Sequence, residues 1–225
     1  MTTGERWVAT LWPFVRAHLP PPPARVIDIG CGPAGGFVPF LRSGGYEGVG
    51  VDPVAPDAAH YHRIEFEHLE APRQFDAAIA SASLHHVTDP RKVLDRLAGT
   101  MTSGGAFIVV EWAWERFDDG TARWCFQRLR EDGAGWIHRR RAEWMTSGKA
   151  WQSYFRGWAQ REGLHRGDDL LRLLDERFER RLQAHGPFFF PDLANTTEAD
   201  EQAAIDAGEI RAMRIDWVGT RRPAS

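Results

Sequence analysis

Residues 25–36 read RVIDIGCGPAGG, and this stretch decides the fold. The apolar run at 25–29 predicts a buried strand, and the residues after the loop predict a helix. Between the two, Gly30, Gly32 and Gly35 form a G-x-G-x-x-G pattern. Because glycine lets the chain turn tightly and lets a ligand approach the backbone, this strand–loop–helix unit is typical of a cofactor-binding site.

The rest of the first half alternates between strand and helix. We expect further strands at 49–51, 61–66, 75–80 and 106–110, and helices at 5–19, at 36–42 and from Asp89–Pro90 to Met101. Pro13 is expected to kink or divide the first of these helices. Alternation of this kind predicts an α/β fold, a doubly wound parallel sheet with right-handed crossovers.

The second half has a different pattern. Residues from about 115 to 178 are expected to be mostly helical, and strands are expected at 179–185 and 210–219, separated by an acidic helical stretch at 197–207. We therefore expect one domain over residues 1–225. Its parts are a helical lead-in at 1–24, a cofactor-binding half at 25–115, a helical substrate lid at about 115–178 and a closing strand pair at 179–225.

Composition excludes several classes of protein. The 225 residues carry a net charge of −3, and the arginines are mixed with acids, which disfavours a nucleic-acid partner. Cys31 and Cys125 are the two cysteines, too few for a disulfide framework, and no zinc-type spacing predicts a metal site. The N-terminal residues include charges and no long apolar stretch, so neither a signal peptide nor a membrane span is expected, and the predicted location is cytoplasmic.

Two acids flank the glycine loop and bear on the cofactor. Asp52 closes the second strand, where a dinucleotide enzyme would hold a ribose, so a nicotinamide or flavin site fits the spacing. Asp28 lies two residues before Gly30 and faces the ligand space. A carboxylate about 4 Å from a phosphate would cost on the order of 4 kcal/mol at an effective dielectric near 20. S-adenosylmethionine carries no phosphate and brings an ammonium and a sulfonium, so Asp28 favours it.

Several motifs together resemble the class I S-adenosylmethionine-dependent methyltransferases, a Rossmann-like family. They are Val26–Gly32, Val49–Asp52, Phe75–Asp76, Ser83–Val87, Gly104–Gly105 and Trp217–Arg222, which cover roughly residues 5–115 and the last strand pair. The resemblance implies a seven-stranded sheet whose last strand is antiparallel. The match departs at Pro33–Gly36, where many relatives carry Gly-Thr-Gly and where Pro33 removes one backbone donor.

The resemblance also implies which residues bind S-adenosylmethionine. Asp28 would lie near the ammonium, Gly30 and Gly32 under the methionine portion, and Asp52 at both ribose hydroxyls. Residues 65–67 would border the adenine and Ser81 the methionine end. The full expected set is Asp28, Gly30, Cys31, Gly32, Asp52, Pro53, Glu65, Phe66, Glu67 and Ser81.

Methyl transfer from a sulfonium mainly requires alignment of the acceptor and exclusion of water. A general base is needed only when the acceptor keeps a proton that it does not lose easily. His85 and His86, after the fourth strand, and Glu111, at the end of the fifth, are the candidate catalytic residues. The alternative is that the histidines are ordinary loop residues and that Glu111 caps a nearby helix.

The aromatic-rich insertion is expected to recognise the methyl acceptor. Seven of the ten tryptophans lie between Trp112 and Trp158, and Trp112, Trp114 and Tyr154 are the expected acceptor contacts. Such rings suit a small aromatic or apolar metabolite methylated on oxygen or nitrogen. The same rings could instead pack against the sheet or against a second copy in a homodimer. Two other functions stay open, a nicotinamide-dependent oxidoreductase and a non-catalytic cofactor-binding protein.

Overall fold

A computed structural model describes residues 2–70, 74–130 and 133–222. Its centre is a seven-stranded sheet of order β3-β2-β1-β4-β5-β7-β6. The strands are β1 (Arg25–Ile29), β2 (Glu47–Val51), β3 (Tyr61–His62), β4 (Phe75–Ser81), β5 (Met101–Trp112), β6 (Phe178–Gly186) and β7 (Arg214–Arg221). β7 runs antiparallel to both of its neighbours, whereas β1 to β5 pair in parallel. This arrangement confirms the predicted doubly wound sheet with an antiparallel last strand.

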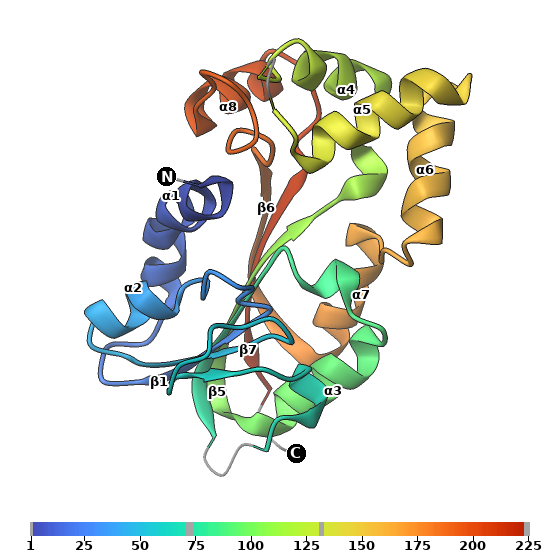
Figure 1. The fold of residues 1–225 in the computed structure, drawn as a ribbon. Helices are drawn as coiled ribbons and strands as arrows, with labels where there is room; N and C mark the ends of the chain where they lie inside the picture. Colours follow the sequence, from blue (N-terminus) through green and yellow to red (C-terminus); the bar gives the residue numbers. More distant parts are fainter. Residues whose placement is uncertain (1, 71–73, 131–132, 223–225) are drawn as a thin grey trace.

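Helices cover both faces of the sheet and one of its ends (Figure 1). They are α1 (Thr3–His18), α2 (Val38–Ser43), α3 (Pro90–Thr100), α4 (Asp119–Phe126), α5 (Trp136–Ser147), α6 (Trp151–Arg161), α7 (Gly167–Arg177) and α8 (Glu198–Asp206), with short 3₁₀ turns η1 (Phe66–His68), η2 (Leu84–His86) and η3 (Trp114–Arg116). Side-chain caps begin several of these helices: Thr2 accepts from the backbone N–H of Glu5, and Asp89 accepts from those of Arg91 and Lys92.

Three predicted elements differ from the structure. β3 ends at His62 rather than at 66, because the chain turns inward there and buries Phe66 in the core. β5 begins at Met101 instead of after the glycines. Gly104 adopts a φ of 74°, and the pairing register with β4 shifts at this point, so the strand continues through the glycines. β7 begins at Arg214 rather than at 210. Pro13 neither divides nor ends α1, which is continuous from Thr3 to His18.

The two faces of the sheet are packed by different helices. On one face, α3 and α7 place Leu94, Leu97 and Leu174 against Phe107 and Trp217. On the other, α1 and α2 bury side chains against β1, β4 and β5, among them Leu11, Val15 and Leu41. β1 is buried on both faces from Val26 onward. Because β1 is held in this way, the chain enters the glycine loop at a fixed position.

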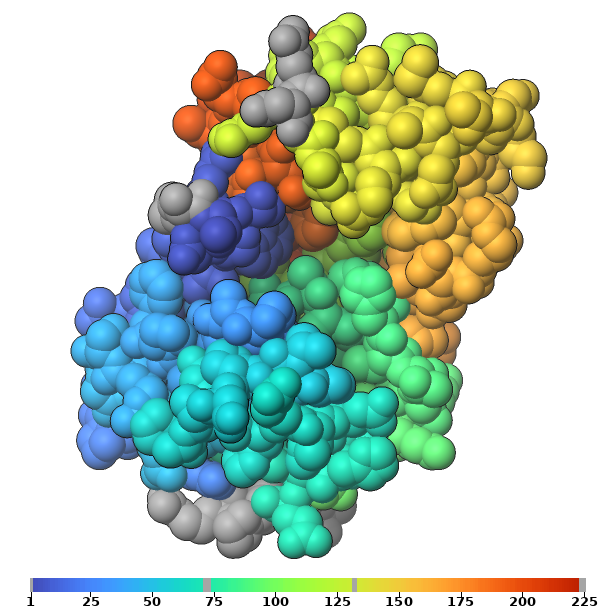
Figure 2. All heavy atoms as spheres, in the orientation of Figure 1, coloured from blue at the N-terminus to red at the C-terminus, as the bar shows by residue number. Residues whose placement is uncertain are grey.

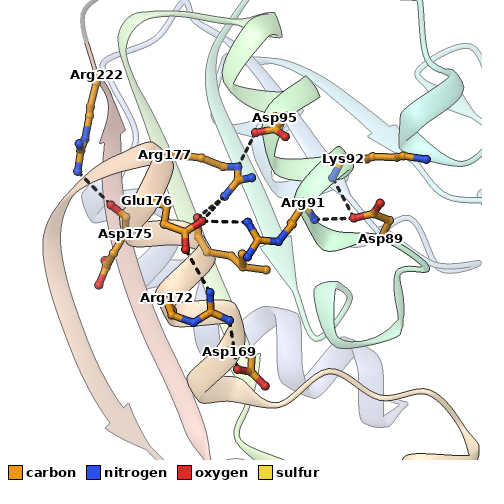
Figure 3. A network of polar contacts seen from close by, with 11 residues as sticks. Asp89, Arg91, Lys92, Asp95, Asp169, Arg172, Asp175, Glu176, Arg177 and Arg222 are labelled. Carbon is orange, nitrogen blue, oxygen red and sulfur yellow. Dashed lines mark hydrogen bonds and ion pairs between the residues drawn. The ribbon is translucent and has the colours of Figure 1, made fainter.

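Ion pairs join α3 and α7 on the outside of the sheet (Figure 3). Arg177 binds Asp95 at 2.6 Å, and Glu176 lies 3.3 Å from Arg91 and 3.1 Å from Arg172. Most of these side chains are exposed, so solvent screens each pair and its contribution to stability is small. Leu170, Leu173 and Leu174 pack α7 on the sheet, so this last helix of the insertion lies with the sheet rather than at its end.

The other helices of the insertion form a separate aromatic layer at the carboxyl ends of the strands. We call residues 114–164 and 187–213 the cap; they contain α4, α5, α6 and α8. Figure 1 shows α4, α5 and α8 gathered at one end of the molecule, with β5 and β6 running toward them. The cap has its own core, which includes Phe117, Trp151, Phe155 and Phe189 together with Trp112 from the end of β5.

Candidate active site

The glycine loop after β1 is built so that backbone, not side chain, faces a ligand. Gly30 and Gly32 have φ angles of 77° and 65°, a region that other residues rarely adopt. A Cβ at Gly30 would lie 2.3 Å from the Cβ of Ser83, so this glycine is also required by packing. A Cβ at Gly32 would meet nothing within 4 Å. The loop therefore has open space beside Gly32, where a ligand can approach the main chain.

Asp28 lies under this loop with its side chain almost fully buried. Its residue is 2% exposed, and its Oδ2 accepts the backbone N–H of Phe37 at 2.7 Å. Burial raises the pKa of Asp28 to about 7; the hydrogen bond from Phe37 opposes the shift and the nearby Asp52 adds to it. A carboxylate in this position gains from a cation beside it, because the cation offsets the cost of burying the charge.

Asp52 connects the loops after β1 and β2. Its Oδ2 accepts the backbone N–H of Gly32 at 3.0 Å, and its Oδ1 accepts that of Val54 at 2.8 Å. An ionised carboxylate has room for about four hydrogen bonds, so both oxygens keep acceptor capacity for a ligand. Parallel strands end at the same edge of the sheet, which is why Asp52 and the glycine loop meet there.

Two cavities lie on either side of the glycine loop and share Gly30, Gly32 and Pro33. The first cavity, of about 460 Å³, is also lined by Asp52, Pro53, Ile64, Glu65, Phe66, Glu67 and His86. The second cavity, of about 710 Å³, is also lined by Trp7, Asp28, Cys31 and Ser81. Figure 2 shows a hollow between the dark-blue start of α1, the yellow part of the cap and the teal residues below. A long ligand can thus cross the loop from one cavity to the other.

Glu111 and His85 form a buried polar pair next to these cavities. Glu111 is 1% exposed, and its Oε2 lies 2.6 Å from Nδ1 of His85. Its Oε1 accepts the backbone N–H groups of Ser83 and Leu84 at 2.8 and 2.6 Å. Burial would raise the pKa of Glu111, but His85 and these hydrogen bonds outweigh it and leave the pKa below its usual value. Glu111 therefore holds the turn η2 and orients His85.

His86 follows on the same turn and lies 4.1 Å from His85, measured between ring centroids. Burial and the neighbouring His85 together lower its pKa to about 4, against an opposing effect of Glu111. At neutral pH the imidazole is therefore uncharged and able to accept a proton or a hydrogen bond. His86 lines the first cavity and also a third one.

The third cavity, which we call the aromatic cavity, lies between the cap and the body, our name for the sheet with α1, α2, α3 and α7. It has a volume of about 350 Å³ and shares Ala82 and His86 with the first cavity and Gly4 and Trp7 with the second. Its aromatic walls are Trp7, Trp112, Trp136, Trp158 and Phe188, and its polar residues include His85 and Asp192. Trp112 and Phe188 stack at 5.4 Å with only 6° between their planes. The cavity thus offers flat apolar surfaces beside the glycine loop.

α8 supports one wall of the aromatic cavity. Glu201 is 0% exposed and accepts three backbone N–H groups: those of Phe188 and Phe189 on Oε1 at 2.7 and 3.1 Å, and that of Phe190 on Oε2 at 2.6 Å. Burial raises the pKa of Glu201 to about 6, although these bonds oppose the shift. Through its backbone, Phe188 is therefore held at a fixed place in the wall.

The structure brings the expected cofactor residues together. Asp28, Cys31 and Ser81 line the second cavity, Asp52, Pro53 and residues 65–67 line the first, and Gly30 and Gly32 line both. Of the candidate catalytic residues, His85 and His86 line the aromatic cavity, whereas Glu111 lies beneath the turn that carries them.

The three expected acceptor contacts are not all brought together. Trp112 lines the aromatic cavity, but Trp114 and Tyr154 line none of the three cavities described above. The indole N–H of Trp114 donates to the carbonyl of His165 at 2.9 Å. Tyr154 is 6% exposed, and its hydroxyl donates to Glu143 at 2.9 Å. Both rings therefore belong to the core of the cap and do not face a cavity.

Sequence reasoning missed Trp7, Phe188 and Asp192. Phe188 and Asp192 lie far along the chain from the glycine loop, Trp7 lies on the helix before it, and only the fold brings all three to the aromatic cavity. The sequence does contain one indication of Trp7: it is a tryptophan on the apolar face of the helix that precedes the first strand. Its indole N–H donates to Oγ of Ser81 at 2.9 Å, at the end of β4.

This strand order, with its antiparallel β7 and its acids at the ends of β1 and β2, defines the fold of a class I S-adenosylmethionine-dependent methyltransferase. A family model described as a methyltransferase domain matches residues 5–177, and the chain belongs to this family. This membership favours a methyltransferase over the nicotinamide-dependent oxidoreductase and the non-catalytic binding protein. The enzyme is an S-adenosylmethionine-dependent methyltransferase.

Individual relatives match less of the chain. It is 33% identical over 98 residues to a ubiquinone biosynthesis O-methyltransferase from Bradyrhizobium sp. (strain ORS 278), and the match spans 38% of each chain. A methyltransferase structure from Mesorhizobium loti has a TM-score of 0.56 at 20% identity and covers 94% of this chain and 97% of its own. The 1,6-didemethyltoxoflavin-N1-methyltransferase of Burkholderia thailandensis has a TM-score of 0.54 at 13% identity and covers 98% of this chain and 79% of its own.

The residues present fit the cofactor. The buried Asp28 suits an ammonium, the open space at Gly32 suits a backbone contact, and Asp52 keeps free acceptor capacity. In the described ranges 2–70, 74–130 and 133–222, no group of three or more His, Cys, Asp or Glu side chains is placed to hold a metal ion. Within the same ranges, no helix has the length and apolar character that a membrane crossing requires.

Proposed function

We propose that this enzyme transfers a methyl group to an oxygen or nitrogen of a small, flat, aromatic or largely apolar metabolite. The observation that carries the proposal is the aromatic cavity, which shares Ala82 and His86 with the first cavity and is walled by indole and phenyl rings. Ring walls of this kind favour a planar acceptor, because stacked and edge-to-face contacts fix its orientation.

The cofactor contacts follow from the same geometry. Asp28 would take the ammonium, Asp52 the ribose hydroxyls, and the segment 65–67 the adenine, with Gly30 and Gly32 under the methionine portion. Cys31, Pro53 and Ser81 would complete the walls. S-adenosylmethionine supplies the methyl group: a lone pair on the acceptor forms the new bond to the methyl carbon as the carbon–sulfur bond breaks and the sulfur becomes neutral.

The protein contributes alignment, exclusion of water and one proton acceptor. Trp7 and Trp112 would hold the acceptor plane, and His86, uncharged at neutral pH, would accept the proton that the acceptor oxygen or nitrogen loses. Glu111 acts through His85 and the η2 backbone and is a positioning residue. The relatives named above include an O-methyltransferase and an enzyme solved with 1,6-didemethyltoxoflavin bound, and both support an acceptor of low molecular weight.

A panel of aromatic and apolar metabolites incubated with methyl-labelled S-adenosylmethionine tests the proposal. We expect one labelled methyl group on an oxygen or nitrogen of a flat acceptor, detected by mass, and a loss of turnover in His86→Asn that is much larger than any change in S-adenosylhomocysteine binding. Transfer to RNA or to a folded protein, with no small acceptor methylated, would overturn it.

A further inference from the structure

We propose that the methyl acceptor carries a protonated amine, which Asp192 binds on the side of the aromatic cavity away from the cofactor. The inference rests on the proposed function, since it names the class of acceptor for the same cavity. Asp192 lines the aromatic cavity and is absent from the lining of the first and second cavities. Its carboxylate is therefore available to the acceptor and not to S-adenosylmethionine.

The Asp192 carboxylate is oriented but only partly used. Its Oδ2 accepts the indole N–H of Trp136 at 3.1 Å, and its backbone N–H donates to the carbonyl of Phe189 at 2.9 Å. Its Oδ1 has no hydrogen-bond partner among the residues that the structure describes. Burial raises the pKa of Asp192, because the charged form is partly removed from water. A cation bound at Oδ1 would offset this cost.

Among the residues that the structure describes, no lysine or arginine forms an ion pair with the Asp192 carboxylate. Among the described lining residues of the aromatic cavity there is no lysine or arginine. Arg6 lowers the pKa of Asp192 through its charge, but its guanidinium donates to the carbonyls of Pro191 and Thr196 at 3.2 and 3.0 Å. His138 also lowers the pKa of Asp192, and its ring Nε2 lies 2.7 Å from the carbonyl oxygen of Arg130. The cavity therefore disfavours an anionic acceptor and favours a cationic one.

The aromatic walls add to this preference. Trp136 donates to Asp192 and packs edge-to-face on Trp112 at 5.1 Å between centroids. Ammonium groups are attracted to the faces of such rings, most strongly to indole. A carboxylate set among indoles and a phenyl ring is thus a site for an amine attached to a flat apolar body.

The amine would be bound, not methylated. Trp112 lies 5.7 Å from His85, and Trp136 lies 5.1 Å from Trp112, so two indole rings in succession connect the histidine turn to Asp192. A protonated amine has no lone pair to accept a methyl group. The accepting oxygen or nitrogen would therefore be a second group, held near His86.

Three probes of similar shape test this inference: tryptamine, its neutral analogue 3-propylindole and the anionic indole-3-propionate. Calorimetry on enzyme saturated with S-adenosylhomocysteine should show tryptamine binding at least tenfold more tightly than 3-propylindole, with the propionate weakest. Asp192→Asn keeps an oxygen for Trp136 and removes only the charge. We expect this variant to lose the preference for tryptamine while its affinities for 3-propylindole and S-adenosylhomocysteine stay within twofold.

Asp206→Asn, an exposed acid on α8, is the control and should keep the wild-type preference. A wild-type preference below twofold, a preference that survives in Asp192→Asn, or a failure of all three probes to bind would overturn the inference. Those results leave methyl transfer to other acceptors intact. Absence of S-adenosylhomocysteine binding, with a preference for tryptamine measured on the ligand-free protein, would instead overturn the proposed function.

Discussion

Asp28 is an acid whose ionisation should depend on whether the cofactor is bound. Burial holds its pKa at about 7 in the free protein, while an adjacent ammonium would favour the charged form. The free enzyme therefore carries a proton on Asp28 below pH 7, and this proton must leave before the cation binds. Because the folded pKa is raised above 3.8, the stability linked to this proton is present below pH 3.8 and is lost as the pH rises through about 7.

The first prediction follows from this linkage. The affinity of the enzyme for S-adenosylhomocysteine should rise between pH 6 and pH 8, by up to about tenfold per unit below the pKa. Asp28→Asn cannot ionise, so its affinity should be lower at pH 8 and nearly constant over this range. Calorimetry at four pH values measures both, and Asp57→Asn, an exposed acid, serves as the control. If Asp28→Asn showed the same pH dependence as the wild type, the titrating group would be a residue other than Asp28.

The second prediction concerns Asp52. Its oxygens accept from Gly32 and Val54 and would also accept two ribose hydroxyls. Hydrogen bonds to a charged group contribute about 1.5–3 kcal/mol each, so Asp52→Ala should weaken S-adenosylhomocysteine binding by at least tenfold. Circular dichroism should show that the fold survives. An unchanged dissociation constant in a folded variant would remove Asp52 from the cofactor site.

At the scale of elements, the pattern of the first half predicted most of what surrounds the loop. β1, β2 and β4 lie where the apolar runs placed them, because each is mostly buried and its apolar run is followed directly by a glycine or a polar residue. β3 could not be bounded from sequence, since Phe66 is apolar in either a strand or a turn, and only the packing of the core selects the turn. The position of Phe188 in the aromatic cavity depends on Glu201, a buried acid on the otherwise polar helix α8, and no local sequence pattern predicted this contact.

Tyr154 on α6 is the subject of the third prediction. Helical spacing alone left it either as an acceptor contact or as a core residue, and the structure packs it in the cap with its hydroxyl on Glu143. Tyr154→Ala should therefore lower stability by about 3–5 kcal/mol, as expected for a buried aromatic. Tyr154→Phe, which loses only one partly exposed hydrogen bond, should cost about 0.5–1.5 kcal/mol. Denaturant titration gives both values. A stable Tyr154→Ala enzyme with impaired turnover would return this residue to the acceptor site.

At the scale of the molecule, α1 connects the body to the cap. Its Trp7 reaches Ser81 at the end of β4 and packs on Phe188 at 5.2 Å. Arg6, one residue earlier, donates to two carbonyls of the segment 191–196. The aromatic cavity lies between these attachments, so the position of the cap over the glycine loop depends on a helix from the other end of the chain.

The last prediction tests this attachment. Arg6→Ala removes both hydrogen bonds from a charged donor, worth about 1.5–3 kcal/mol each before relaxation. Each 1.4 kcal/mol lost in local stability should speed amide exchange about tenfold where exchange occurs by local opening. We expect faster exchange in residues 187–196 and at the start of α1, and no change in β1 and β4. Arg16→Ala, an exposed arginine on the same helix, should leave all of these rates unaltered. Faster exchange throughout the sheet in Arg6→Ala would mean that Arg6 stabilises the whole fold, whereas a change confined to the two segments would show that α1 holds the cap in place over the active site.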